Sequence, residues 1–134
     1  MQWDQSLSIG VPQIDQQHQE WIDRLNAVTL ATQAGQGQSR VVEALDFLVD
    51  YTEYHFESEE RLMADERYPE LDEHRQKHRE LTRTLANLEQ DFDEDGVTPA
   101  LVQAIDTLVG NWLVQHIQEV DRRFGVFLRN RSQS

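Results

Sequence analysis

Hydrophobic side chains recur at intervals of three or four residues along most of the chain. That spacing aligns them on one face of an α-helix. Short breaks divide the pattern, so the sequence predicts four helices, over residues 13–34, 39–65, 69–91 and 98–125. Because the connections are short, neighbouring helices are expected to run antiparallel. The predicted fold is all-α: an antiparallel up-down-up-down four-helix bundle in one domain over residues 1–134, with the first dozen residues as an extended N-terminal arm.

Capping and turn residues mark the expected helix ends. Gly35 and Gly37 should end the first helix, and Ser39 is placed to cap the second. An acidic loop is expected over residues 93–96. Thr98-Pro99 then has the cap-then-proline order that favours a helix start. Gly125 is expected to end or loosen the fourth helix.

Composition narrows the class of protein. A length of 134 residues suits one domain, and three prolines and six glycines favour helices over a turn-rich β fold. The formal charge of −13 disfavours nucleic-acid and anionic-membrane partners. The absence of cysteine excludes disulfides, thiolate metal sites and cysteine nucleophiles. With no targeting segment or long apolar run recognised, a soluble, cytoplasmic, monomeric protein is expected.

All five histidines lie on the hydrophobic stripes, together with one glutamate and one aspartate: His18, His55, Glu59, His74, His78, His116 and Asp121. Burying such groups is costly unless they are paired or bound to a metal. A lone histidine there is usually a satisfied core residue. In an antiparallel bundle, however, all seven positions fall at the same depth, which scattered structural histidines would not do.

Spacing within each helix supports a shared centre. His55 and Glu59 are four residues apart, and so are His74 and His78, so each pair can reach one point. His116 and Asp121 are five apart, a rotation of about 140° in an ideal helix. Either Asp121 reaches around a second metal ion, or the helix contains a local π-type irregularity there.

The donor types limit the metal. Seven ligands are too many for one tetrahedral zinc, and a site without sulfur argues against copper electron transfer and iron–sulfur clusters. The set suits two iron ions, with the carboxylates bridging and the imidazoles in terminal positions.

These residues resemble the signature of the hemerythrin family. The matching motifs are His18 within Ile14–Gln19, the run His55–Glu60 followed by Met63, Tyr68-Pro69 with His74 and His78, and Trp112-Leu113 with His116-Ile117 and Asp121. The resemblance covers nearly the whole chain. It implies that His74, His78 and His116 bind one iron and that His18 and His55 bind the other. Glu59 and Asp121 would bridge them beside an oxo or hydroxo group, and dioxygen would bind at the iron with two histidines.

The pocket beside that iron is expected to be apolar, with Trp21, Phe56, Trp112, Leu113 and Ile117 as candidates that core packing explains equally well. Trp21 departs from the family, which usually has leucine there, and Leu81 stands where an aromatic residue is common. Asp15 or Glu60 could orient the histidines, although a solvated surface explains each of them at least as well.

Three functions are compatible with the sequence. The first is a non-enzymatic protein that stores, carries or delivers dioxygen, with an oxygen-consuming enzyme as a candidate recipient. Five neutral imidazoles and only two carboxylates leave the metal pair more positive than in catalytic di-iron bundles, which favours releasing dioxygen over activating it. The alternatives are a di-iron oxidase or peroxidase-like enzyme, and an oxygen- or redox-sensing module.

Overall fold

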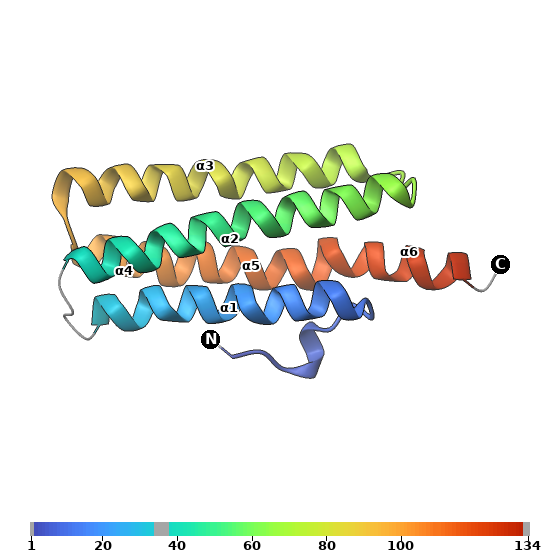
Figure 1. The fold of residues 1–134 in the computed structure, drawn as a ribbon, viewed down its shortest axis with the longest axis horizontal. Coiled ribbons are helices and arrows are strands. Elements are labelled where there is room, and N and C mark those ends of the chain that lie inside the picture. The colour runs from blue at the N-terminus through green and yellow to red at the C-terminus, as the bar shows by residue number, and fades with distance from the viewer. Residues whose placement is uncertain (1, 34–37, 133–134) are drawn as a thin grey trace.

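The computed structural model describes residues 2–33 and 38–132, which form the predicted four-helix bundle (Figure 1). Three of its rods are single helices: α1 (Pro12–Gln33), α2 (Gln38–Asp65) and α3 (Leu71–Asp95). The fourth rod is continuous but changes its winding, and consists of α4 (Pro99–Ala104), η2 (Ile105–Val109), α5 (Gly110–Gln115), η3 (His116–Asp121) and α6 (Arg122–Ser132). Segments η2 and η3 are π-helical. Successive rods run antiparallel, as expected (Figure 1).

The N-terminal arm lies along the bundle and contains a short 3₁₀ helix, η1 (Gln5–Leu7). Asp15 of α1 binds the C-terminal end of this arm. The Asp15 carboxylate accepts hydrogen bonds from the Ile9 backbone amide at 2.9 Å and from the Ser8 hydroxyl at 2.6 Å. Gly125 allows the arm to come close: a Cβ atom there would lie 2.0 Å from the Ile9 carbonyl oxygen. The expectation that Gly125 ends the fourth helix is wrong, since α6 continues to Ser132.

Several predicted helix ends need correction. The stretch at which the first helix was expected to end, residues 34–37, lies outside the described residues. Helix α2 starts at Gln38, one residue before the position expected for its cap. Helix α3 starts at Leu71 rather than Pro69 and extends through the acidic segment to Asp95, ending at Gly96 with φ 72°. Thr98 caps α4 as predicted, its hydroxyl accepting from the Leu101 amide at 3.1 Å.

The hydrophobic stripes meet in the core. Ile14, Leu48, Leu81 and Leu113 are among the side chains with almost no exposed surface. The three-four spacing of hydrophobic residues in the fourth predicted helix, Leu101, Ile105 and Leu108, predicts that Leu108 faces inward, but it is 56% exposed. It lies in η2, where the wider π turn rotates side chains away from the positions that a 3.6-residue period predicts.

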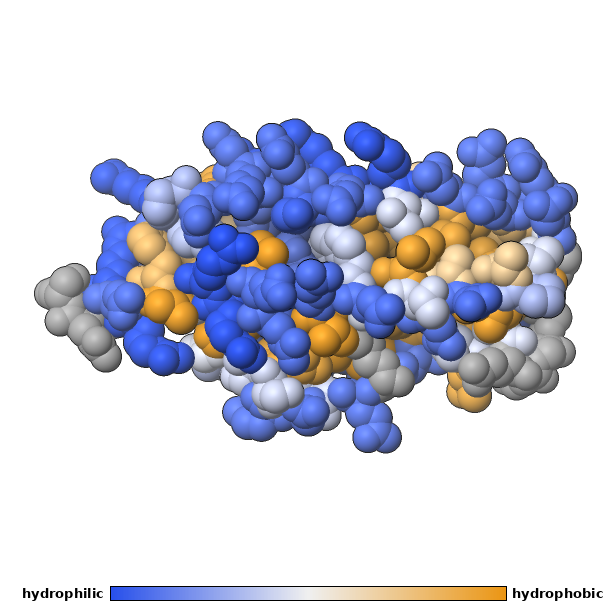
Figure 2. All heavy atoms as spheres, turned by 180° about the vertical axis from the view of Figure 1, so that it is seen from behind, coloured by the Kyte–Doolittle hydropathy of each residue, from blue (hydrophilic) through white to orange (hydrophobic). Residues whose placement is uncertain are grey.

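The outer surface seen in Figure 2 is mainly hydrophilic, with separate apolar patches between polar side chains. Within the described residues, no helix combines the length and apolar character that crossing a bilayer requires.

Candidate metal centre

Seven polar side chains from all four rods converge inside the apolar core, and each is at most 4% exposed. Helix α1 supplies one, α2 and α3 supply two each, and η3 supplies two. They are the seven expected from the sequence: His18, His55, Glu59, His74, His78, His116 and Asp121. Donor atoms of these residues form two overlapping groups, each with all its atoms within 4.8 Å of one another. The structure therefore brings all the predicted ligands to one place.

Glu59 divides the histidines into two sets. Its Oε2 atom lies 3.2 Å from Nε2 of His55 and 3.7 Å from Nε2 of His18. Its Oε1 atom lies 2.6 Å from Nε2 of His74 and 3.2 Å from Nε2 of His78. We refer to His18 and His55 as the two-histidine set, and to His74, His78 and His116 as the three-histidine set.

Asp121 divides its oxygens in the same way. Oδ2 lies 3.0 Å from Nε2 of His18, and Oδ1 lies 2.9 Å from Nε2 of His74 and 3.2 Å from Nε2 of His116. Each carboxylate thus presents one oxygen to each histidine set. This is the arrangement expected of carboxylates that bridge two ions.

The π-helical segment η3 explains the five-residue spacing of His116 and Asp121. An ideal α-helix would place these side chains about 140° apart. The wider turn of η3, which begins at His116 and ends at Asp121, lets both face the core. Of the two explanations that the sequence left open, the structure therefore contains the π-type irregularity.

The hydrogen bonding of the cluster is incomplete without a further partner. Nine of its buried nitrogen and oxygen atoms have none, including Nε2 of His18, His55, His78 and His116 and both oxygens of Asp121. Buried polar atoms left in this state are costly and rare. Seven of the nine, namely four imidazole Nε2 atoms and three carboxylate oxygens, lie where the two histidine sets meet, so the residues match the chemistry of a metal pair.

Comparison with known proteins gives the family. Residues 9–127 match the model of the hemerythrin HHE cation binding domain. A bacteriohemerythrin of Stenotrophomonas maltophilia is 33% identical over 124 residues, covering 91% of this chain and 77% of that protein. A crystal structure of wild-type hemerythrin superposes with a TM-score of 0.82 at 30% identity, covering 93% of this chain and 95% of the other. This chain belongs to the hemerythrin family. A myohemerythrin of Theromyzon tessulatum is a more distant relative, 24% identical over 92% of this chain and 89% of that protein.

Two histidines of the centre are oriented by hydrogen bonds from side chains outside it. Nδ1 of His78 lies 2.9 Å from Glu60, one of the two acids considered for this role. The other, Asp15, bonds to the N-terminal arm instead. Nδ1 of His55 lies 2.8 Å from the side-chain oxygen of Gln17, which the sequence reading missed. Such partners fix the ring and its tautomer, leaving Nε2 free to bind a metal.

Aromatic rings cover the centre on one side. Phe56 stacks on His78 with centroids 3.8 Å apart, and Trp112 stacks on His116 at 4.4 Å. Trp21, which is fully buried, lies 4.9 Å from the ring of His55 and 5.3 Å from Phe56. The remaining two predicted pocket residues, Leu113 and Ile117, are also fully buried. Trp21 and Phe56, both buried, therefore keep water away from the two-histidine set, whereas Trp112 is partly exposed.

Electrostatics keep both carboxylates charged. Burial favours their neutral forms, but the histidines around them outweigh this effect and lower the pKa of Glu59 and of Asp121. Burial opposes a charge on His18 as well, yet the carboxylates of Asp121 and Glu59, 3.0 Å and 3.7 Å from its Nε2 atom, raise the pKa of His18 to about 9. For His55, burial dominates and lowers the pKa. The core thus contains two ionised carboxylates, whose charge a dication can neutralise.

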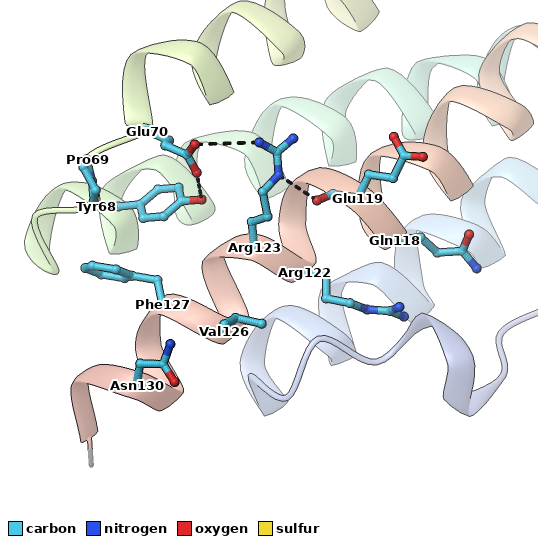
Figure 3. A pocket seen from close by; sticks show the side chains of 10 residues that line it. All are labelled: Tyr68, Pro69, Glu70, Gln118, Glu119, Arg122, Arg123, Val126, Phe127 and Asn130. Atoms are coloured by element: carbon cyan, nitrogen blue, oxygen red, sulfur yellow. Dashed lines mark hydrogen bonds and ion pairs between the residues drawn. The ribbon is translucent and has the colours of Figure 1, made fainter. Parts of the chain in front are cut away.

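A separate groove of about 510 Å³ lies between the 68–70 turn and α6 (Figure 3). Tyr68, Phe127 and Arg122 are among the residues that line it, and none of the seven clustered side chains does. Arg123 crosses one side, with its guanidinium 3.7 Å from Glu70 and bonded to the backbone oxygen of Glu119 at 3.0 Å (Figure 3). This groove does not open onto the centre.

Proposed function

We propose that this protein binds dioxygen reversibly at two iron ions and so stores, carries or delivers it. The proposal rests on how the carboxylate oxygens are shared between the histidines: Glu59 and Asp121 each present one oxygen to the two-histidine set and the other to the three-histidine set. This division suits a pair of ions better than a single one. The names of its relatives, bacteriohemerythrin and myohemerythrin, support the same function.

The roles of the residues follow from their positions. The three-histidine set would hold one ion and the two-histidine set the other, which leaves the second ion one protein donor short. When bound, the iron pair supplies the electrons that dioxygen accepts. The buried rings of Trp21 and Phe56 exclude water beside the two-histidine set. Gln17 and Glu60 keep the rings of His55 and His78 turned inward.

Binding rather than catalysis follows from the donor set. Five neutral imidazoles and two carboxylates stabilise high-valent iron less than the carboxylate-rich sets of catalytic di-iron bundles. The predicted pocket residues contribute rings and aliphatic groups, and the indole nitrogen of Trp21 donates away from the centre to Thr52 at 2.9 Å. A pocket of this kind offers little with which to orient a substrate. We also expect the protein to act as a monomer.

The test is a visible spectrum of the iron-loaded protein, reduced without oxygen, then exposed to air and flushed with argon. We expect a ligand-to-iron charge-transfer band that appears with air and disappears on flushing, with one dioxygen taken up per two irons. The iron-free protein is the control. A chain that retains no iron, or a band that argon never removes, would refute the proposal. Sustained consumption of added peroxide would favour the enzyme instead.

A further inference from the structure

The seven side chains of the centre are buried, yet one side of the bundle brings solvent close to two of them. A surface depression of about 240 Å³ lies along the seam between α3 and the α5–η3 segment, and His116 and Trp112 form part of its wall. A hollow of about 10 Å³, lined by His74, has Glu73, Lys77, Val120 and Arg123 in common with this depression. Both histidines belong to the three-histidine set.

Two other sides of the described part of the bundle are closed or lead elsewhere. Trp21 and Phe56 pack against each other over the two-histidine set, at 0% and 5% exposure. A larger hollow of about 520 Å³ lies between α1 and α2 and carries two acids, Glu20 and Asp23, but no histidine of the centre lines it. An ion arriving there would meet the buried amide of Gln17 first.

Acidic side chains outnumber basic ones along the seam. Glu73, Glu80 and Glu119 line the depression and Glu70 and Glu73 line the inner hollow, against Lys77 and Arg123, which line both. One wall of the seam is the π-helical segment η3, which carries His116 and Asp121 themselves. At the inner end, Nδ1 of His74 is buried without a hydrogen-bond partner while its Nε2 faces Glu59. Solvent and centre are therefore separated here by little more than the rings of His74 and His116.

We propose that divalent iron enters the centre along this seam, with Glu73 and Glu119 binding the hydrated ion before the three-histidine set takes it over. The inference rests on the proposed function only in assuming that the centre holds iron. Carboxylate oxygens replace water around a dication readily, and an excess of acidic side chains along the route attracts the cation. Lys77, the chain's only lysine, and Arg123 line the same depression and oppose entry, but the four glutamates of the two cavities outnumber them.

The experiment measures the rate at which metal-free protein takes up Co²⁺ without oxygen. Quenching of tryptophan fluorescence reports arrival, because Trp21 and Trp112 lie beside the histidines. The test variant is Glu73→Gln/Glu119→Gln. The control is Glu20→Gln/Asp23→Asn, which makes the same change in net charge at the other hollow.

We expect the seam variant to take up Co²⁺ roughly 3- to 10-fold more slowly at low salt, and the control to stay within about twofold of the unmodified protein. Lys77→Gln should accelerate uptake. The final Co²⁺ content should be equal in all variants, which also shows that each one folds. Should the double variant fold poorly, Glu73→Gln alone serves, since its side chain is exposed.

Equal slowing of both double variants would mean that only the overall charge matters, and would overturn the entry route. Unchanged uptake in the seam variant would overturn it too. In either case the unmodified protein still fills with metal, so the proposed function stands. If the unmodified protein binds no Co²⁺ or iron at all, the proposed function itself fails.

Discussion

Replacing Trp21 with leucine tests the aromatic cover of the two-histidine set. The indole is fully buried, lies 4.9 Å from the ring of His55 and donates a hydrogen bond to Thr52 at 2.9 Å. Truncating a buried tryptophan to alanine costs about 3–5 kcal/mol. Leucine retains part of the packing. We therefore expect the free energy of unfolding to fall by about 2 kcal/mol because of the cavity and by about 1 kcal/mol because of the lost hydrogen bond.

The functional effect of Trp21→Leu should appear in the kinetics. Space opened beside His55 admits ligand and water, so we expect rates of dioxygen association or of autoxidation to change severalfold. Stopped-flow absorbance of the iron-loaded protein measures both, and thermal unfolding measures the lost stability. Trp3→Leu is the matched control, because Trp3 packs on the core from the N-terminal arm. Unchanged rates in Trp21→Leu, or the same change in Trp3→Leu, would refute the reasoning.

Three further predictions follow from single contacts. Gln17→Leu removes the partner of His55 Nδ1 and should weaken metal binding about 10- to 100-fold, measured by competition with a chelator; full retention would contradict an orienting role. Gly125→Ala places a methyl group against the Ile9 carbonyl, so protease cleavage should become faster in the arm, whereas Gly110→Ala, with open space around it, serves as control. Removing the metal should lower the unfolding temperature by roughly 10 °C in calorimetry, because the buried donors lose their partner; an unchanged transition would argue against a metal centre.

The sequence predicted the fold and the convergence of the cluster because one physical signal carried both. Hydrophobic periodicity defined the rods, and the antiparallel order of short-linked rods fixed the depth of every histidine. Polar groups on apolar stripes stand out against such a pattern. The five-residue step from His116 to Asp121 indicated either a second metal ion reached by Asp121 or a π-type irregularity, and the structure contains the irregularity.

What the sequence did not reveal depends on contacts between rods or on local winding. Gln17 resembles the neighbouring surface glutamines, and only its approach to His55 from another helix gives it a role. Segment η2 contains no two site residues whose spacing would have indicated a π turn, so the exposure of Leu108 could not be predicted from the sequence. The sequence suggested that Gly125 ends or loosens a helix. A glycine is needed there because the backbone of Ile9 lies against it, and Ile9 is more than a hundred residues away in the chain.

The π turn at η3 has a consequence for how this chain can change over generations. Asp121 is the last residue of this segment and Gly125 lies about one turn further along the same rod, so the extra residue sets the rotation of both. Deleting one residue between His116 and Asp121 would restore regular winding and turn the rest of the rod by about 100°. The carboxylate would leave its histidines, and the arm would meet a side chain where it now meets a glycine. Length variation among natural homologues should therefore avoid this stretch and accumulate in the connections between rods.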